Sequence, residues 1–465
     1  MKPSSSTSEG AGADRARAGV TDSLFGPLFS SPAVAAELTA TAWVQAMLDA
    51  ESALAGALAD VELIPRAAAE AIARCCVVTE FDVAEIATRS LGAGNPVVPM
   101  VSALTGLVPA DAAGFVHKGA TSQDILDTAT MLVARRAAVP LFAKLDTVLA
   151  ACAGLAGTHR DTVLAGRTLG QQAVPTTFGL TAAGWLTGLD AAVGRLSTVV
   201  ESLPAQLGGA AGTLASLGRH GIPVARAFAA RLGLVEPVLP WHTLRGPVVD
   251  LATALGAVAG ALGKIATDVI LFAQTEVAEL AEPDGAGGSS TMPHKHNPIR
   301  AITALAGVRR TPGLVATVLS AMPAEHERAT SGWHLEWEPL RELLDLLGGS
   351  AARLAELTPG LRVDTDRMRG NLDLTNGLLL AENVTTRLAG TLGRLPAHQL
   401  VTELARRAGR TGRGLREILA EDSRITDVLP ATELDAALDP AGYLGVAGEF
   451  VDRALAAYEK GRTNR

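Results

Sequence analysis

Cysteines, aromatic residues and basic runs are all scarce in this sequence of 465 residues. Its three cysteines (Cys75, Cys76 and Cys152) cannot build a disulfide framework, and none belongs to a Cys-x-x-Cys pair. Aromatic residues make up only 3% of the chain, which disfavours a sandwich of strands rich in aromatic side chains. A net charge of −8 without a basic run argues against nucleic acid as a partner.

The sequence also lacks a stretch typical of a leader or a membrane span. The polar residues 1–22 contain no apolar core, so we expect a disordered tail rather than a secretory signal. The most membrane-like run, residues 169–189, contains Gln171, Gln172 and Pro175, which disfavour a spanning helix. We therefore expect a cytoplasmic protein with no membrane partner.

Apolar and small residues dominate instead. Hydrophobic residues make up 48% of the chain and charged residues 19%, which is the balance of a globular protein. The length exceeds a single ordinary core, so we expect two or three domains. Abundant alanine, leucine and glycine favour closely packed helices over strands.

The clearest periodic segment is 250–282, in which apolar residues recur at alternating steps of four and three. These residues are Leu251, Leu255, Val258, Leu262, Ile265, Val269 and Phe272. The spacing predicts one helix of about 33 residues, roughly 50 Å long at 1.5 Å per residue. A helix of this length suits an extended bundle rather than a small single-layer domain.

Further helices are predicted wherever the same periodicity recurs. They cover residues 31–61 (in two pieces), 124–155, 177–203, 298–322 (kinked near Pro312), 335–357, 367–387 and 397–408, with one more at the C-terminus. The sequence thus predicts an all-α protein with a central bundle of long helices. We divide it into a disordered tail (1–22), an N-terminal helical domain (23–115), a central bundle domain (116–357) and a C-terminal helical domain (358–465).

The most informative stretch is 287–298, which reads Gly-Gly-Ser-Ser-Thr-Met-Pro-His-Lys-His-Asn-Pro. Its glycines and serines form a small-residue loop whose backbone N–H groups can face a ligand. Pro298 favours the first turn of a following helix, and a loop that runs into a helix N-terminus can bind an anion. A hydroxyl placed there lies where an alkoxide is favoured.

Three other segments combine glycine with polar residues in apolar surroundings, namely 117–124, 166–177 and 325–334. In the first, Thr121 or Ser122 can cap a helix that begins near Asp124. Taken alone, each segment also has an ordinary structural explanation. The three are then an N-cap, a capped loop with a surface arginine, and a solvated run of charges.

Other kinds of site find less support in the sequence. His294 and His296 could share a metal ion, but no carboxylate or cysteine stands at ligand spacing, so we expect no metal. No P-loop and no strand followed by Gly-x-Gly-x-x-Gly is present. A Gly-x-Ser-x-Gly elbow is also missing, although residue counting alone does not exclude a Ser-His-Asp triad.

Taken together, these segments resemble the fumarase/aspartase superfamily. Residues 287–298 match its GSSxMPxKxNP signature, and a Thr-Ser segment (119–124) and a Gly-Arg-Thr segment (166–168) precede it in the order of that superfamily. The resemblance extends from Leu24 to Arg453 and implies an all-α fold of three domains with a central five-helix bundle. It also implies a homotetramer in which each active site draws residues from three subunits.

Within the superfamily, the chain most resembles the bacterial 3-carboxy-cis,cis-muconate cycloisomerases. The segments that carry this resemblance are 27–31, 45–49, 119–124, 241–243, 325–328 and 333–334. Adenylosuccinate lyases are the alternative, but they usually carry Arg-Tyr where this chain has Leu28-Phe29 and a histidine where it has Leu169. Gln172 replaces a histidine that is common to both groups. An inactive, crystallin-like relative is a further alternative, which the retained Ser289, Lys295 and Asn297 oppose.

The resemblance implies that one carboxylate of a di- or tricarboxylate adds to a conjugated double bond and closes a lactone, in the breakdown of aromatic compounds through protocatechuate. Ser289 would transfer the proton, with its alkoxide favoured by loop N–H groups, the following helix dipole and Lys295. Lys295 and Asn297 would stabilise the enolate-like aci-carboxylate. The expected substrate-binding residues are His117, Thr121, Ser122, Thr168, Gln171, Arg245, Ser290, Met292 and Arg328. No metal or organic cofactor is required.

Overall fold

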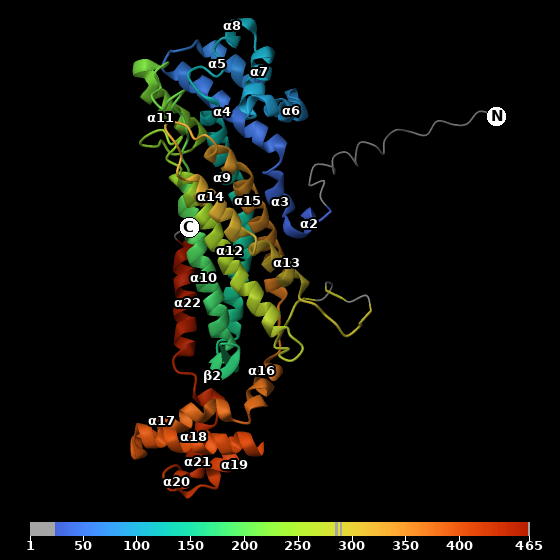
Figure 1. The fold of residues 1–465 in the computed structure, drawn as a ribbon, viewed down its shortest axis with the longest axis vertical. Helices are drawn as coiled ribbons and strands as arrows, with labels where there is room; N and C mark the ends of the chain where they lie inside the picture. Colours follow the sequence, from blue (N-terminus) through green and yellow to red (C-terminus); the bar gives the residue numbers. More distant parts are fainter. Residues whose placement is uncertain (1–23, 284–286, 289–290, 464–465) are drawn as a thin grey trace, which may run out of the picture. The chain divides into compact units, whose positions relative to one another are not determined.

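The computed structural model of the protein describes residues 24–283, 287–288 and 291–463, most of them in helices (Figure 1). In the first part of the chain the α-helices are α2 (Gly26–Phe29), α3 (Pro32–Ala36), α4 (Ala40–Asp60), α5 (Arg66–Cys75), α6 (Val83–Ala93), α7 (Val97–Leu107), α8 (Ala110–Ala113), α9 (Ser122–Thr158), α10 (Phe178–Glu201), α11 (Gly221–Leu232) and α12 (Gly246–Phe272). The later ones are α13 (Ile299–Val308), α14 (Thr311–Ala321), α15 (Gly332–Leu357), α16 (Thr365–Leu372), α17 (Ala381–Leu392), α18 (Arg394–Thr411), α19 (Leu415–Ala420), α20 (Ser423–Thr426), α21 (Ala431–Ala437) and α22 (Ala447–Thr463). The all-α prediction is confirmed.

The described residues group into two compact units, each built from separated stretches of chain. Of the described residues, unit 1 takes 24–146, 192–263 and 303–354, and unit 2 takes 147–191, 264–283, 287–288, 291–302 and 355–463. The long helices α9, α10, α12 and α15, and the shorter α13, each contribute residues to both units. The division into three domains stays a prediction.

The periodic segment forms α12, and its apolar seam is buried. Leu251, Leu255, Val258, Leu262, Ile265 and Val269 are each at most 1% exposed. The helix ends at Phe272, ten residues before the predicted end at Glu282. The chain leaves the helix because Glu279 turns inward to pair with Arg167, and Leu280–Ala281 (β3) pairs with Arg362–Val363 (β4).

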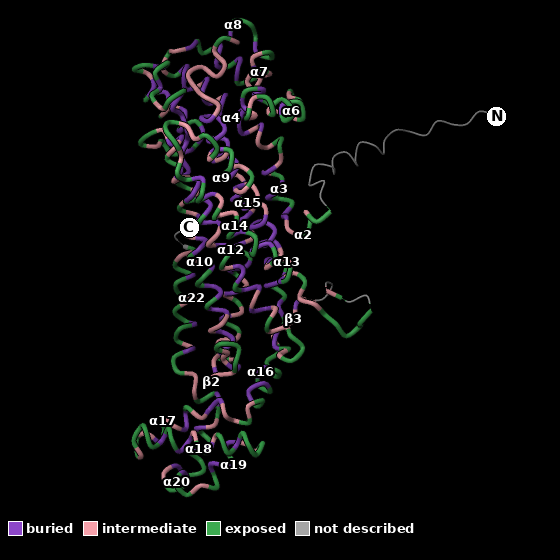
Figure 2. Tube along the Cα trace, in the orientation of Figure 1, coloured by how far each residue is buried: buried purple, intermediate pink, exposed green. Residues whose placement is uncertain are grey.

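The N-terminal part of unit 1 follows the sequence prediction of two helical pieces over residues 31–61. The short α3 precedes α4, and the side chain of Thr39 caps α4 by accepting a hydrogen bond from the N–H of Ala42 at 3.2 Å. Both α5 and α11 pack against α4, whose alanines and leucines are largely buried (Figure 2). Small side chains allow this close packing.

No strands were predicted from the sequence in this part of the chain. Residues 163–168 (β1) and 171–177 (β2) form an antiparallel hairpin in unit 2, with Thr168 paired to Gln171. Its two-residue turn consists of Leu169 and Gly170, whose φ angles are +51° and +78°. Positive φ at both turn residues is the geometry that matches the twist of two short strands.

The predicted helix over 367–387 is interrupted in unit 2. Asn376 and Gly377 adopt φ angles of +49° and +83°, so the chain turns between α16 and α17. The helices α17 to α21 then enclose a separate apolar core. Its fully buried members include Val384, Leu388, Leu415, Ile418 and Ile425.

Two described helices, α9 and α12, are long and apolar enough to cross a membrane by length and composition alone. Core helices of globular bundles pass the same test. Packing accounts for the hydrophobicity of α12, because its seam is buried within the folded chain.

Candidate active site

The signature loop is closed at its neck by main-chain and side-chain hydrogen bonds. The N–H of Asn297 donates to the carbonyl of Gly287 at 2.9 Å, and its side-chain amide donates to the same oxygen at 3.0 Å. Gly288 forms an antiparallel bridge with His296. A side chain at position 287 is excluded, because φ is +83° and a Cβ would lie 2.0 Å from the carbonyl oxygen of Asn297.

The helix that follows the loop begins where the sequence predicts, at Ile299 after Pro298. Its N-terminal amides are already occupied, since the N–H groups of Arg300 and Ala301 donate to the buried carboxylate of Glu282 at 3.2 and 2.8 Å. Glu282 therefore neutralises the positive end of the α13 dipole. The helix dipole expected to stabilise an alkoxide on the loop is satisfied within the chain, which corrects that part of the sequence prediction.

A cavity of about 1110 Å³ lies beside the neck of the loop in unit 2. Gly287, Gly288, Lys295 and Asn297 line it, together with Arg362. The side chain of Lys295 is exposed and makes no ion pair within the described chain. Such a cationic, hydrogen-bonding cavity suits an anionic ligand. The two serines of the signature, Ser289 and Ser290, lie outside the described residues.

The hairpin tip carries the second group of predicted ligands. Thr168 and Gln171 are exposed on either side of the turn, and Leu169 is 103% exposed. Arg167, one residue before the tip, is bound on both nitrogens to the buried Glu279 at 2.9 and 2.7 Å. The structure does not bring the tip to the signature cavity, whose lining within the described chain excludes Thr168 and Gln171.

Gln172 has a structural partner. Its side-chain amide donates to the carbonyl of Asn371 at 2.9 Å and so fastens the hairpin to α16. Asn371 in turn donates to Glu279 at 2.7 Å. Gln172 therefore anchors the hairpin to α16 close to its turn.

The Thr-Ser segment lies at the N-terminus of α9 in unit 1. The sequence predicts that the side chain of Thr121 or Ser122 caps this helix. In the structure the buried carboxylate of Asp124 instead accepts a hydrogen bond from the backbone N–H of Thr121 at 2.9 Å. It also accepts from the N–H groups of Gly208 and Gly209 and from His242 at 2.7 Å. The hydroxyls of Thr121 and Ser122 make no hydrogen bond within the described chain, so both can serve a ligand.

Gln123 joins three of the segments that the sequence singles out. Its amide donates to the carbonyl of His242 at 2.9 Å and its oxygen accepts from Arg328 at 2.9 Å. Arg328 also donates to the carbonyls of Gly209 and Ala210. Half-buried Arg328 is thus held at the N-terminal end of α9, close to the predicted ligands there.

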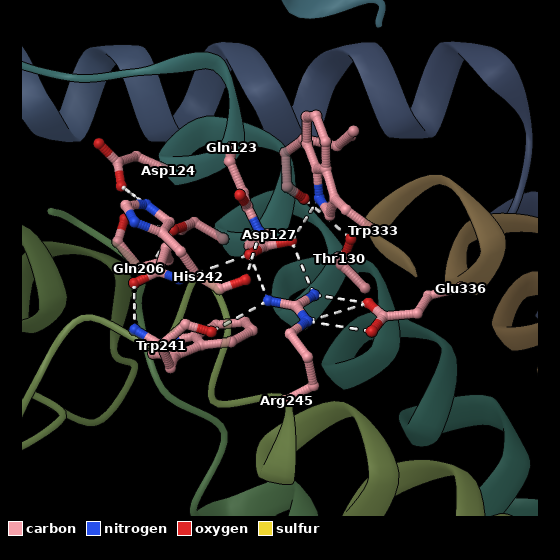
Figure 3. Close-up of polar contacts among 12 residues, drawn as sticks. Gln123, Asp124, Asp127, Thr130, Gln206, Trp241, His242, Arg245, Trp333 and Glu336 are labelled. Atoms are coloured by element: carbon pink, nitrogen blue, oxygen red, sulfur yellow. Dashed lines mark hydrogen bonds and ion pairs between the residues drawn. The ribbon is translucent and has the colours of Figure 1, made fainter. Parts of the chain in front are cut away.

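Arg245 has a different environment from the one that the sequence predicts. It is 3% exposed and lies between Asp127 and Glu336, to which it donates at 2.7 and 2.6 Å (Figure 3). Trp333 donates to the same Asp127 at 2.9 Å, and the Arg245 guanidinium stacks on the Trp241 ring. Burial lowers the pKa of Arg245, but the two carboxylates outweigh it and raise the pKa. An internal ion-pair role accounts for Arg245, so we leave it out of the proposed substrate site.

Backbone strain marks the same segments. Among the described non-glycine residues with positive φ are His117 (+55°), Leu169 (+51°) and His326 (+50°), one in each of the three polar segments. This conformation costs a side-chain-bearing residue about 1–2 kcal/mol and often accompanies functional sites. No periodicity in the sequence indicates it.

Comparisons with known proteins identify the family of this chain. A family model described as Lyase matches residues 29–310, and one described as Adenylosuccinate lyase C-terminus matches residues 377–454. The chain is 45% identical over 462 residues to nitrosuccinate lyase of Streptomyces davaonensis, covering 96% of this chain and 98% of that protein. It is also 45% identical over 441 residues to 3-carboxy-cis,cis-muconate cycloisomerase of Pseudomonas aeruginosa, with coverages of 94% and 96%. The crystal structure of 3-carboxy-cis,cis-muconate lactonizing enzyme from Pseudomonas putida has a TM-score of 0.88 at 40% identity, over 94% of this chain and 99% of that one.

Proposed function

Because the chain belongs to the lyase family of the fumarase/aspartase superfamily, we propose that it makes or breaks a bond beta to a carboxylate. The reaction that we place first is the interconversion of 3-carboxy-cis,cis-muconate and a carboxymuconolactone. One carboxylate oxygen adds to the conjugated double bond, and the electrons move to the neighbouring acid group as an enolate-like aci-carboxylate. A proton delivered to carbon then completes the lactone. The relatives of that name, together with the cationic signature cavity, support this reaction.

Three residues of the signature would carry the chemistry. Ser289 transfers the proton to or from carbon, while Lys295 and Asn297 stabilise the extra charge on the aci-carboxylate. Since Glu282 caps α13, the alkoxide of Ser289 must depend on loop N–H groups and on Lys295. One preorganised donor of this kind contributes roughly 3–4 kcal/mol to a transition state.

The remaining ligands would bind and orient the carboxylates of the substrate. They are His117, Thr121, Ser122 and Arg328 from unit 1, and Thr168, Gln171, Ser290 and Met292 from unit 2. Because the signature cavity of unit 2 is not lined by Thr168 and Gln171 of the same unit, we propose that a homotetramer completes each site from several subunits. A mass near four times 47.6 kDa in light scattering would agree with this assembly.

A second candidate is the elimination of nitrite from nitrosuccinate, which leaves fumarate. The 45% identity to a nitrosuccinate lyase equals that to the cycloisomerase and covers slightly more of the chain. Nitrite is a weak base and departs with the C–N bonding pair without first taking up a proton. Leu169 and Gln172, where adenylosuccinate lyases usually have histidines, suit either a lactone closure or this departure.

Adenylosuccinate is disfavoured as a substrate despite the C-terminal family match. Its amine leaving group needs a general acid, and the hairpin tip offers only Leu169 in its place. Leu28 and Phe29 also replace the Arg-Tyr pair associated with nucleotide binding in those enzymes. A cytoplasmic location and a role in aromatic breakdown accompany the cycloisomerase proposal.

A substrate screen tests the proposal directly. Purified protein should consume 3-carboxymuconate with loss of its diene absorbance, and it should release no fumarate from adenylosuccinate. Release of nitrite from nitrosuccinate at a higher kcat/KM would select the second candidate. No turnover or binding of any di- or tricarboxylate would overturn both and favour the inactive relative.

A further inference from the structure

His117 and Glu51 form a close polar pair that no motif in the sequence predicts. Nδ1 of His117 lies 2.6 Å from Oε1 of Glu51, which belongs to α4. Glu51 is 1% exposed, whereas the imidazole keeps about a fifth of its surface exposed. The buried carboxylate therefore holds one edge of the ring, and the Nε2 edge remains for a ligand.

The backbone around His117 is fixed in a strained conformation that keeps this pair together. His117 has a φ of +55° and Gly119 one of +84°. A Cβ on Gly119 would lie 2.5 Å from the side chain of Leu217, so only glycine fits there without displacement. Strain retained beside a polar pair suggests a role in binding or catalysis rather than in packing.

Burial of the Glu51 carboxylate is energetically unfavourable. Its second oxygen, Oε2, is buried without a hydrogen-bond partner within the described chain. A buried carboxylate that lacks one partner is destabilising unless a cation lies next to it. Protonated His117 supplies that cation.

From this geometry we infer that Glu51 is a positioning residue, which holds His117 as an imidazolium and presents its Nε2–H to a carboxylate of the substrate. The inference deepens the proposed function and rests on it. It gives His117 a definite charge state and adds a residue of α4 to the site. An imidazolium donates a charge-assisted hydrogen bond to a carboxylate, whereas a neutral ring with its proton on Nδ1 offers only an acceptor at Nε2.

The charged groups around the pair agree with this state. Burial lowers the pKa of His117, but its hydrogen bond to Glu51 and the negative charges of Glu51 and Asp124 outweigh burial and raise the pKa. Cys76, next to Glu51, stays a neutral thiol because burial first and then the charge of Glu51 raise its pKa. The ammonium group of the neighbouring Lys118 lies over the Phe115 ring, 5.3 Å from its centroid.

The pH dependence follows from the sign of this shift. A raised pKa keeps the imidazolium at pH values above the ordinary histidine pKa of about 6.5, and affinity for a carboxylate is lost as the pH rises through the raised value. Neutralising Glu51 moves this loss to lower pH. The effect should appear mainly in KM, since the pair acts on substrate binding.

The test compares Glu51→Gln with the unchanged protein from pH 5.5 to 8.5, using whichever acid the protein turns over. We expect kcat/KM of the variant to fall about 10- to 100-fold at pH 8 and by less than about threefold at pH 5.5, where His117 is protonated in both. An equal loss at every pH would overturn the inference and indicate a structural role. Asp60→Asn, which removes a surface carboxylate of the same helix, is the matched control and should keep the normal profile.

A double-mutant cycle keeps the test decisive if Glu51→Gln alters folding. Adding Glu51→Gln to His117→Gln should cause no further loss of kcat/KM if Glu51 acts through the imidazole. Additive losses would contradict the inference. Glu51→Asp, which retains the charge, should restore most of the activity at pH 8. If the unchanged protein turns over no acid at all, the proposed function fails, whatever the variants do.

Discussion

The ion network around Arg245 and the neck of the signature loop use polar groups in opposite ways. In unit 1, Arg245 is 3% exposed and divides its donors between Asp127 and Glu336, so this cluster is closed on itself. In unit 2, hydrogen bonds are made at the base of the loop, at Gly287 and Asn297, whereas Lys295 stays exposed beside a cavity. A buried, paired charge supports the fold, and an exposed charge on a fixed backbone can act on a ligand.

The largest expected effect concerns the loop. Ser289→Ala should lower kcat by about 10³- to 10⁴-fold, because no other hydroxyl is proposed to transfer the proton. Steady-state kinetics would measure the loss, and light scattering would show that the assembly is unchanged. Ser290→Ala is the neighbouring comparison and should cause a much smaller loss. Near-normal turnover of Ser289→Ala would remove this residue from the mechanism.

Disrupting the ion network around Arg245 should lower the stability of the fold. Arg245→Met leaves Asp127 and Glu336 buried without their cation, and the free energy of unfolding should fall by about 3–5 kcal/mol in denaturant titrations. Burial and Asp127 raise the pKa of Glu336 even with Arg245 nearby, so a protonated carboxyl relieves the variant at low pH. The destabilisation should therefore be smaller at pH 5 than at pH 8.

Arg231→Met provides the matched comparison for that prediction. Arg231 also binds one carboxylate through two nitrogens, that of Asp60, but both side chains are about a third exposed. Its removal should cost at most about 1 kcal/mol. Equal losses for the two arginines would mean that burial does not distinguish them.

The smallest effect is expected at the hairpin tip. Leu169→Gly relieves a positive φ, and after the entropy that glycine adds to the unfolded chain the net stabilisation should be about 0.5 kcal/mol. Turnover should nevertheless fall, because an exposed leucine kept in a strained turn is better explained by a ligand or a neighbouring subunit. Lower stability with unchanged turnover would show that Leu169 serves only the hairpin.

The sequence predicted several parts of the site that the structure places in position. The Pro298 signal gives the start of α13, and the glycine at 287 is required by the close approach of the Asn297 carbonyl. The Thr-Ser segment does begin α9. The roles of Ser289, Lys295 and Asn297 remain predictions.

The hairpin over 163–177 was missed because its strands are short and contain no alternation of apolar and polar residues. The end of α12 was misplaced for a related reason. The helical periodicity weakens only gradually after Phe272, while the partner that draws Glu279 inward lies 112 residues earlier in the chain.

By itself, the sequence determined the helical class, the apolar seam of α12 and the signature loop, since periodicity and turn chemistry act between near neighbours in the chain. Only the tertiary structure decided which charges are free. Asp127 meets Arg245 across 118 residues and Glu51 meets His117 across 66. Whether an arginine binds a substrate or an internal carboxylate depends on burial and on partners brought together by packing, which local spacing does not encode.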